Sequence, residues 1–483
     1  MSEDERRPRF WQVAFLLMRT CIPAFVLLLL ASWLPASGQA QEDGGGAALE
    51  LTLDDAIRLA LENNRDLLDA RLSRTIQEFS LDVAEDRYRP TAAFSPVVRA
   101  ARERDTTAEL AAVTGLRIET GGQFSLRLSE PVAGPDDADG RVSLSFSQPL
   151  LRGFGIDIDT APLRIARLGD RISVLAFRET VAGVVVSTIN AWRNLVRARR
   201  QLEIGEASLV RARQQLETNR TLIEAGEMAA REILQSEADV ADRELALVQT
   251  RNNVTTANFG LIGILDIDSA TVVRPMEVPA TPRPVLSLDE AIKTALGHSP
   301  SHARALLDRE IAEIDLKLAE DHQLWDLSLD ADVSRGTGGG AGQTDYSAGL
   351  RLTIPLWDRG PELGLRAAQA GVTQAERGLV ELRQSMDIQV RQAVHDVEVG
   401  LRQIELARQA LRLAEEKLAI ERSKLQQGLS SIFQLALFED DLVRAQNAEV
   451  DALVDYENAL TALDQTLGTT LETWGIAVEQ VGR

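Results

Sequence analysis

The sequence has few of the residues that would build thick cores or cross-links. Only one of its 483 residues is a cysteine, Cys21, and aromatic residues make up 4%. We expect Cys21 to be removed with an N-terminal signal segment, which excludes disulfides and thiolate metal sites from the mature protein. Few aromatics, with abundant Ala, Leu, Glu, Arg and Gln, favour long helices joined through narrow apolar seams over ordinary globular domains.

Basic residues and reactive clusters are also scarce. The formal net charge is −21, which argues against a nucleic-acid partner because such a partner requires a basic face. The four histidines, His298, His302, His322 and His395, show no metal-binding spacing such as H-E-x-x-H. The sequence contains no catalytic constellation. We therefore predict no catalytic residues, no cofactor, no metal and no enzymatic activity.

Proline is absent between Pro162 and Pro275 and again after Pro361. As one helix, residues 163–225 would span roughly 95 Å at 1.5 Å per residue, a length that a soluble globule does not use. Apolar residues recur here every seven positions, stop at Gly226 and then resume: Leu195, Leu202, Leu209, Leu216 and Ile223, then Ile233, Val240 and Leu247. A heptad broken by a helix-ending glycine predicts an antiparallel helical hairpin with its tip near Gly226.

The hairpin pattern occurs a second time. Its apolar residues keep the seven-residue step on both sides of Gly428: Ile404, Leu411, Leu418 and Leu425, then Leu435 and Leu442. Gly428 follows Gly226 by 202 residues, as Leu425 follows Ile223. Two similar capped helix starts, at residues 51–57 and 286–292, precede the two hairpins. The sequence therefore predicts an internal duplication.

These patterns divide the chain. Residues 1–40, with arginines before an apolar run, are predicted to be a secretory signal peptide; the alternative is a transmembrane anchor, which Arg19 and Pro23 disfavour. The predicted segments that follow are a flexible lead-in (41–50), the first structural repeat (51–270), a Pro-rich linker (271–285), the second repeat (286–470) and a C-terminal tail (471–483).

The hydrophobic period changes to two in one block of each repeat. Apolar residues alternate with Ser, Thr, Asp or Arg within residues 92–148 and again within 327–354, which predicts strands with one apolar face. The first block is about 29 residues longer and holds an extra hairpin. Residues 103–135 can therefore either add strands to the sheet or form an extracellular loop, and we favour the loop.

Strands with one apolar and one polar face suit a barrel wall between lipid and water. The four to six strands of one chain cannot close a barrel, since about eight are needed, and an open sheet edge is not tolerated in hydrocarbon. Several chains must then share one barrel. The predicted fold class is an internally duplicated α+β membrane protein, with long antiparallel coiled-coil helices and about four strands per chain in a shared transmembrane β-barrel; four strands each would give twelve in a trimer.

The order of these motifs resembles the TolC-like outer-membrane efflux proteins over residues 49–470. The matching segments are the helix starts (Leu51–Ala56 and Leu286–Ala291), the strand exits (Gln148–Gly155 and Pro355–Gly360) and the hairpin tips (Leu222–Leu234 and Leu425–Leu437). The resemblance implies a homotrimer in the outer membrane of a Gram-negative cell, extending into the periplasm. In it the long helices would form a periplasmic α-barrel beside a trimeric transmembrane β-barrel of twelve strands. It also implies the exit duct of a tripartite efflux or type I secretion system, with a periplasmic adaptor, or membrane fusion protein, and an inner-membrane transporter as partners. The cargo would be small molecules or polypeptides.

The resemblance also assigns candidate residues. Adaptor contacts are expected at the hairpin tips, at Ile223, Gly226, Glu227, Leu425, Gly428 and Leu429, although helix capping alone explains the glycines. A tunnel constriction is expected near the tips, at Glu232, Gln235, Gln434 and Asp440, although the acidic pair that the family often carries after the second tip is absent. The alternative for the nearby acidic run 439–441 is a solvated helix face.

Aromatic residues mark the predicted helix–strand junctions. A girdle at the membrane interface is expected from Tyr88, Phe154, Trp325 and Trp357, and ordinary packing at a crowded junction remains the alternative. For the whole chain the alternative function is a secreted coiled-coil scaffold without a pore, whose strands form a soluble cap. The period-two strands in both repeats favour the duct.

Overall fold

The computed structural model describes residues 48–101, 104–133, 140–226, 229–276, 287–337 and 343–478, and the unit that contains them begins at Ala48. The predicted signal peptide, most of the lead-in and most of the Pro-rich linker lie outside the described residues. Their assignments therefore stay predictions.

Helices dominate the chain. They are α2 (Leu53–Asn63), α3 (Arg65–Glu85), the 3-10 turn η1 (Asp86–Tyr88), α4 (Ile156–Asp159), α5 (Ala161–Glu224), α6 (Glu232–Leu265), α7 (Leu288–His298), α8 (Pro300–Asp321), α9 (Gly360–Gln426), α10 (Ile432–Leu467) and α11 (Thr470–Thr473). The strands are β1 (Ala48–Leu51), β2 (Thr91–Ala101), β3 (Arg104–Arg117), β4 (Gln123–Ala133), β5 (Arg141–Pro149), β6 (Val272–Pro275), β7 (Asp326–Gly336) and β8 (Thr344–Thr353).

Two helix starts are fixed by matching capping boxes. At α2 the side chain of Thr52 accepts a hydrogen bond from the backbone of Asp55, whose carboxylate in turn accepts from the backbone of Thr52. Ser287 and Glu290 repeat this arrangement at α7. Each box satisfies backbone N–H groups that the first turn leaves without a partner. The two predicted helix starts are therefore helix starts in the structure.

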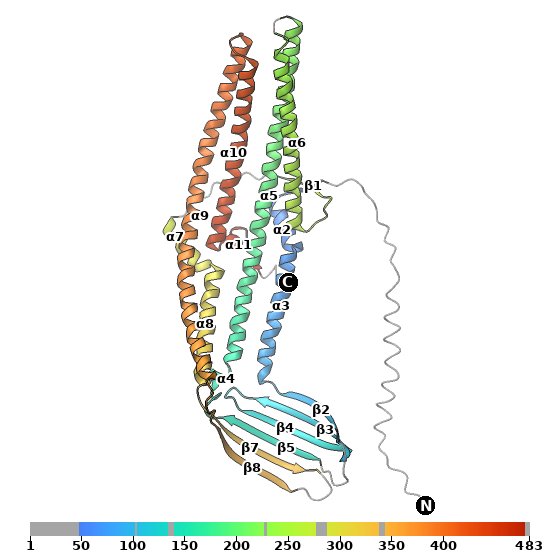
Figure 1. The fold of residues 1–483 in the computed structure, drawn as a ribbon, viewed down its shortest axis with the longest axis vertical. Helices are drawn as coiled ribbons and strands as arrows, with labels where there is room; N and C mark the ends of the chain where they lie inside the picture. Colours follow the sequence, from blue (N-terminus) through green and yellow to red (C-terminus); the bar gives the residue numbers. More distant parts are fainter. Residues whose placement is uncertain are drawn as a thin grey trace, which may run out of the picture. The chain divides into compact units, whose positions relative to one another are not determined.

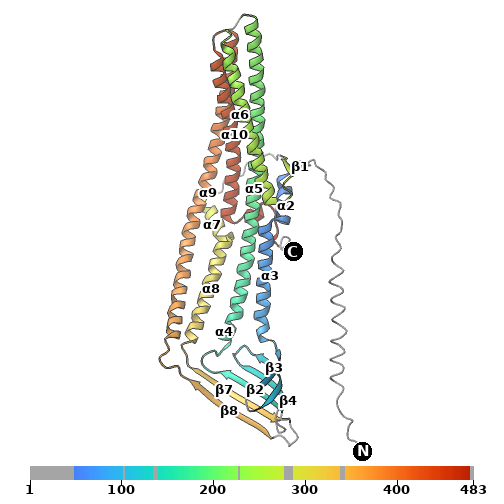
Figure 2. The ribbon, with the colours of Figure 1, turned by 45° about the vertical axis from the view of Figure 1, so that its right-hand side comes forward.

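The helices near the sheet form a single layer. α3 contacts α5, α5 contacts α8, and α8 contacts α9, so the order across the layer is α3-α5-α8-α9 (Figures 1 and 2). Farther from the sheet, α6 pairs with α5 and α10 pairs with α9. The two long helices contain 64 and 67 residues, and each ends at the tip of one of these hairpins.

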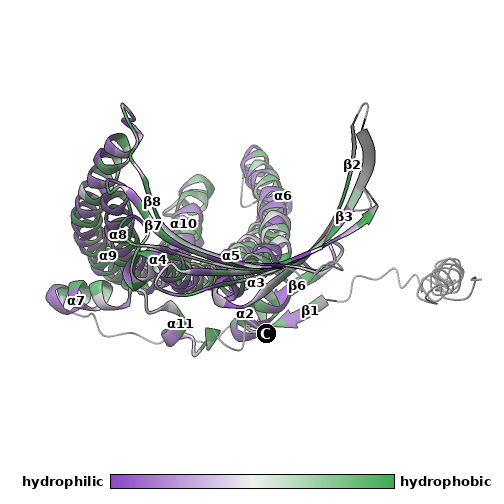
Figure 3. Cartoon of the chain, turned by 90° about the horizontal axis from the view of Figure 1, so that it is seen from below, coloured by the Kyte–Doolittle hydropathy of each residue, from purple (hydrophilic) through white to green (hydrophobic). Residues whose placement is uncertain are grey.

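Within the described residues, one antiparallel sheet contains six strands in the order β2-β3-β4-β5-β7-β8. Seen from below, the sheet is an open arc with β2 and β8 at its two edges (Figure 3). This corrects two expectations. The chain supplies six strands rather than about four, and the preference for a loop over residues 103–135 is wrong, because β3 and β4 hydrogen-bond along their lengths to each other and to β2 and β5.

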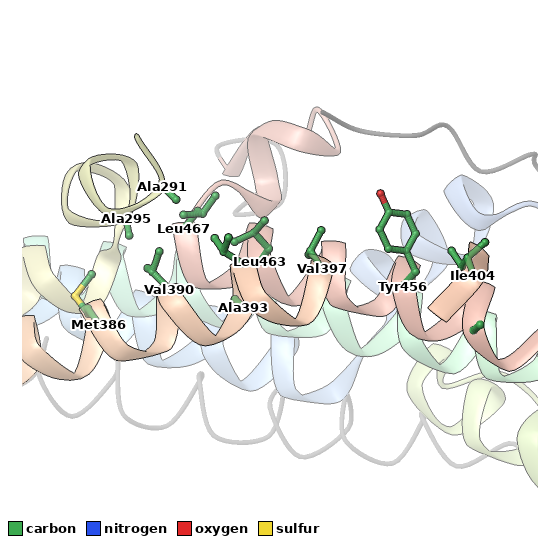
Figure 4. Close-up of a cluster of buried hydrophobic side chains, with 12 residues drawn as sticks. Ala291, Ala295, Met386, Val390, Ala393, Val397, Ile404, Tyr456, Leu463 and Leu467 are labelled. Atoms are coloured by element: carbon green, nitrogen blue, oxygen red, sulfur yellow. The ribbon is translucent and has the colours of Figure 1, made fainter. Parts of the chain in front are cut away.

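The helical packing is held by narrow apolar clusters. One cluster joins α7, α9 and α10 through small and branched side chains, including Ala291, Val390, Val397 and Leu463 (Figure 4). Between Val397 and Ile404 of this cluster, Gly400 of α9 lies against Tyr456 of α10, where an added Cβ would meet the Cα of Tyr456 at 3.3 Å. A glycine at this position lets the two helix backbones approach closely.

One stretch of α5 is long and apolar enough to cross a membrane by composition. In the structure it is part of a core, because Val181, Val185 and Ile189 are fully buried together with Ile57 of α2 and Leu471 of α11. The contacts of this stretch with α2 and α11 explain its hydrophobicity. We therefore do not count it as a membrane span.

A short parallel pair of strands ties the start of the first repeat to its end. Leu49 of β1 lies opposite Val273 of β6. The side-chain oxygen of Asn258, on α6, accepts a hydrogen bond of 2.8 Å from the backbone N–H of Val273. These contacts fix the N-terminal segment of the described unit against the hairpin α5–α6.

Candidate functional site

The cross-strand register of the sheet decides which side chains share a face. Leu126 of β4 lies opposite Leu144 of β5, and Leu144 lies opposite Val333 of β7. Since paired residues project to the same side of a sheet, the register extends this face from β2 to β8. We call it the apolar face, and its apolar members include Phe94, Val98, Leu110, Ala112, Leu116, Phe124, Leu126, Leu128, Val142, Leu144, Phe146, Leu327, Leu329, Ala331, Val333, Tyr346, Ala348, Leu350 and Leu352. The same register also places Thr114, Glu130, Gln148, Arg335 and Thr344 on this face.

Most large side chains of the apolar face are not covered by other parts of the chain that the structure describes. Phe94, Tyr346 and Leu350 are 67%, 83% and 68% exposed. Phe124 and Phe146 stack with ring centroids 4.6 Å apart, which joins β4 to β5 on this face. A continuous uncovered apolar surface over six strands is much more than the scattered apolar residues of an ordinary soluble surface. Lipid is the environment in which it is stable.

The opposite face of the sheet is polar on β4, β5, β7 and β8. The hydroxyl of Ser147 donates a hydrogen bond of 2.7 Å to Asp330, and Arg351 lies 3.3 Å from the same carboxylate. We call this the polar face, and on these four strands it comprises Ser125, Arg127, Ser129, Ser143, Ser145, Ser147, Ser328, Asp330, Asp332, Ser334, Ser347, Arg351 and Thr353. On β2 and β3 it carries mainly small residues, with Glu109 and Arg117.

The four residues predicted as an aromatic girdle all lie at helix–strand junctions. Phe154 follows β5, Trp325 precedes β7 and Trp357 follows β8, and these side chains are 50%, 53% and 95% exposed. Trp357 also has φ = 61°, a conformation that side chains other than glycine rarely adopt. An almost fully exposed indole on a strained backbone has no packing role within the chain.

Tyr88 differs from the other three. Its hydroxyl donates a hydrogen bond of 2.7 Å to the backbone carbonyl of Asp159. Burial, then the nearby charge of Asp159, raises the pKa of Tyr88 to about 12. The Asp159 carboxylate is itself paired with Arg117 of β3. Tyr88 therefore takes part in a buried junction that fastens α3 and β3 to α4, as the packing alternative expects.

Both predicted tip glycines have the geometry of a helix C-terminus. Gly226 and Gly428 have φ = 76° and 71°, the left-handed conformation that glycine adopts without strain. Their N–H groups donate to the carbonyls of Ile223 and Leu425, each over 3.0 Å. Leu429, just beyond, is 72% exposed. Glu227, predicted as a contact residue, lies outside the described residues.

Below the second tip a buried carboxylate holds the turn. Glu421, 4% exposed, accepts a hydrogen bond from the hydroxyl of Ser430 and lies 3.2 Å from the ammonium of Lys424. The Ser430 hydrogen bond is the main reason that the pKa of Glu421 lies below its ordinary value; burial opposes it and Lys424 adds to it. The buried contacts of Glu421 thus stabilise the tip, while the side chain of Leu429 is exposed on its surface.

The predicted constriction residues are not gathered at one point by contacts within the chain. Gln235 and Gln434 are exposed, and Gln434 interacts with Ser430 in its own turn. Glu232 lies 3.4 Å from its neighbour Arg231. Asp440 instead reaches across to Arg243, with 3.0 Å between guanidinium and carboxylate. The negative charge of Asp440 is therefore compensated within the chain.

Sequence reasoning missed the side chains around this contact. A cavity of about 360 Å³ between the hairpins is lined by charged and polar residues that include Arg211, Arg243, Arg422 and Glu439. Glu439 is 12% exposed and pairs with Arg211 at 2.9 Å and with Arg422. The alternative of a solvated helix face is therefore wrong for Glu439. Arg243 follows Val240 by three residues, a seam position, and a charge at such a position was the available signal.

Comparison with known proteins agrees with this geometry. The family model described as outer membrane efflux protein matches residues 291–469. The outer membrane efflux protein BepC of Brucella suis biovar 1 is 23% identical over 361 residues, which cover 72% of this chain and 70% of BepC.

Solved structures share the fold. The Campylobacter jejuni CmeC outer membrane channel is 15% identical with a TM-score of 0.66, covering 89% of each chain. The outer membrane protein VceC of Vibrio cholerae is 17% identical with a TM-score of 0.67, covering 86% of this chain and 96% of VceC. The match over the second repeat, the relative and the shared fold confirm the resemblance to outer membrane efflux proteins that was recognised from the sequence.

Proposed function

We propose that this protein is the outer-membrane exit duct of a tripartite export system, conducting cargo passively across the periplasm and the outer membrane. One observation carries the proposal. The register of the six-stranded sheet places apolar side chains on one face and serines, aspartates and arginines on the other. That division is what a barrel wall between lipid and water requires.

Assembly follows from the open sheet edges. β2 and β8 each leave a row of backbone groups without a strand partner among the described residues. In a membrane such edges must be paired, so β8 of one copy joins β2 of the next. The two strands run in opposite senses, and the pairing would continue the antiparallel order. The resemblance to the family supports three copies.

The finer assignments rest on the exposed tips. The ends of the hairpins α5–α6 and α9–α10 lie far from the sheet (Figures 1 and 2), and Gly226 and Gly428 follow the last residues of α5 and α9. A periplasmic adaptor would meet a duct anchored in the outer membrane at these ends. At the second tip the apolar side chain of Leu429 is exposed. The neighbouring polar groups of Glu421 and Ser430 are hydrogen-bonded to each other. We place the adaptor contact at these tips and the inner-membrane transporter beyond it.

The scaffold alternative explains less of the structure. A soluble cap would have to cover the apolar face, and the described residues provide no helix or strand against it. No group of three or more His, Cys, Asp or Glu that could hold a metal was found among the described residues. A conduit needs neither a metal nor a catalytic group. Its selectivity resides in the width and charge of the lumen.

The test is a planar-bilayer recording with protein purified from the outer-membrane fraction. Discrete, long-lived current steps from inserted protein support the duct. A protein found in the soluble periplasm, or one that cannot be inserted, contradicts it and returns the scaffold. If the inserted protein carries no current, opening the tips by substitution at Gln434 would separate a closed duct from a solid assembly.

A further inference from the structure

We propose, on the basis of the duct function above, that all six strands of each chain enter the membrane. A trimer would then close a barrel of eighteen strands instead of the twelve that the resemblance implies. The wider pore would admit bulkier hydrophilic cargo than a twelve-stranded barrel does.

The added strands have the lengths of membrane strands. β3 and β4 contain 14 and 11 residues, and β5, β7 and β8 contain 9, 11 and 10. A tilted strand needs about 9–11 residues to cross the hydrocarbon core. An extracellular loop would not need two strands of this length, paired with the strands beside them over most of their residues, with one register shift in the β2–β3 ladder and one in the β3–β4 ladder.

The added strands also continue the apolar face. Leu126 of β4 lies between Leu144 of β5 and Thr114 of β3, and Ala112 lies between Leu128 of β4 and Phe94 of β2. Leu126 and Leu128 are 46% and 43% exposed, close to the 49% of Leu144. A hairpin that stood in water would have no reason to keep its apolar residues in register with the lipid face.

The dimensions of the chain agree with six strands. Strands about 4.8 Å apart and tilted by about 40° occupy roughly 38 Å of barrel circumference when there are six, and roughly 25 Å when there are four. The layer of α3, α5, α8 and α9 covers about 32–40 Å at the usual 8–10 Å between helix axes. Six strands per chain therefore give the β-barrel about the same circumference as the layer of helices that it continues. Because both widths are counted per chain, this holds for any number of copies.

The consequence for cargo is a matter of width. Barrel diameter grows roughly in proportion to strand number, so eighteen strands give a pore about 1.5 times as wide as twelve. The added lumen surface carries Ser125, Arg127 and Ser129 on β4. On β3 it carries Glu109 and Arg117 together with Ala111, Val113 and Gly115. Such a lumen suits large polar solutes rather than small apolar ones.

Single cysteines provide the first test, because the only native cysteine, Cys21, lies in the predicted signal peptide. Ser125→Cys and Leu126→Cys on β4 are compared with their direct cross-strand partners, Ser145→Cys and Leu144→Cys on β5. Spin labels are attached to the protein in lipid vesicles, and their accessibility to oxygen and to a water-soluble nickel chelate is measured. We expect both strands to alternate, with the leucine positions exposed to lipid and the serine positions to water.

The outcomes separate the two proposals. If β5 alternates while both labels on β4 are open to water, β3 and β4 lie outside the membrane and the eighteen-stranded barrel is wrong, while the duct function stands. If neither strand alternates, the membrane barrel itself is wrong. Thr114→Cys and Val113→Cys repeat the test on β3, where Thr114 pairs with Leu126 and Val113 with Arg127.

A second measurement addresses the width from outside the cell, so that closure at the tips has no influence. Maleimides carrying polyethylene glycol of increasing mass are added to intact cells that carry Ser145→Cys. Deleting residues 102–133 removes β3 and β4 together and preserves the antiparallel order of the remaining strands. We expect the full chain to react with polymers about 1.5 times as wide as the deletion admits. If the deletion variant folds and admits polymers as wide as the full chain does, the proposal is wrong. If the deletion variant does not fold, the spin-label accessibilities on β3 and β4 decide the question.

Discussion

The guanidinium of Arg243, on α6, lies 3.0 Å from the carboxylate of Asp440, on α10, and this pair joins the two helical hairpins. The Arg243 side chain is only 9% exposed and also lies 2.9 Å from Asp239. Burial opposes its charge, but the hydrogen bond to Asp239 and the acids around it outweigh burial, so the pKa of Arg243 stands above its ordinary value. A buried cation with this many partners fixes how the hairpins meet.

Replacing Arg243 should weaken the protein more than replacing Asp440. Arg243→Met leaves Asp239 and Ser208 without their partner in a mostly buried site, and we expect a loss of about 1–3 kcal/mol. Asp440→Asn should cost less than about 1 kcal/mol, since Asp440 is half exposed and solvent screens its charge. Urea unfolding in detergent, with the double variant completing a thermodynamic cycle, gives the coupling between them.

Arg402→Met is the matched control for that cycle. Arg402 is 68% exposed, and among the described residues its ion pair is with Glu405, three residues on in its own helix. Its removal should change stability by less than about 0.5 kcal/mol. Similar losses for Arg243→Met and Arg402→Met would mean that the contact between the hairpins contributes little.

The sequence predicted the parts of this fold that depend on local periodicity. Gly226 and Gly428 end the two heptad runs in the sequence, and both lie at helix C-termini in the structure. A helix end can be predicted in this way because it depends on the residues next to it in the sequence. The sequence could not decide between strand and loop for β3, because Ala108, Ala111 and Ala112 weaken its alternation and strand pairing depends on residues far away. Arg243 was visible as a charge on a seam, but its partner Asp440 depends on how two separate hairpins pack.

Two glycines of α9 should respond to alanine in opposite directions. Gly378 has open space around its Cβ position and is exposed, so Gly378→Ala should stabilise the protein by about 0.5–1 kcal/mol through helix propensity. A Cβ added at Gly400 would lie only 3.3 Å from the Cα of Tyr456. There the crowding, about 1–3 kcal/mol, should exceed the gain in propensity and lower the melting temperature. A rise in melting temperature for both variants would show that α9 and α10 can move apart freely.

The second hairpin tip should loosen in acid. Because the pKa of Glu421 is depressed in the folded protein below its ordinary value of 4.5, its carboxylate contributes stability above that value. That contribution is lost as pH falls through the folded pKa. Hydrogen exchange of residues 421–431 should therefore accelerate, relative to the unfolded-chain rate, as the pH falls below the ordinary pKa of 4.5. In Glu421→Gln this extra acid dependence should be missing, and a variant that still shows it would assign the effect to another group.

Trp357 should report the membrane interface directly. The indole is 95% exposed and its backbone is strained, so only contact outside the chain can account for it. Trp192, which is 5% exposed in the core around α5, is the internal control. Two single-tryptophan proteins, each with phenylalanine at the other tryptophans, are placed in vesicles of lipids brominated at different depths. Since amphipathic rings favour the headgroup region, bromine near the lipid carbonyls should quench Trp357 most strongly. Bromine at any depth should quench Trp192 little. If Trp357 is quenched no more than Trp192, the junction lies in water, and the boundary of the membrane must be moved farther along the strands.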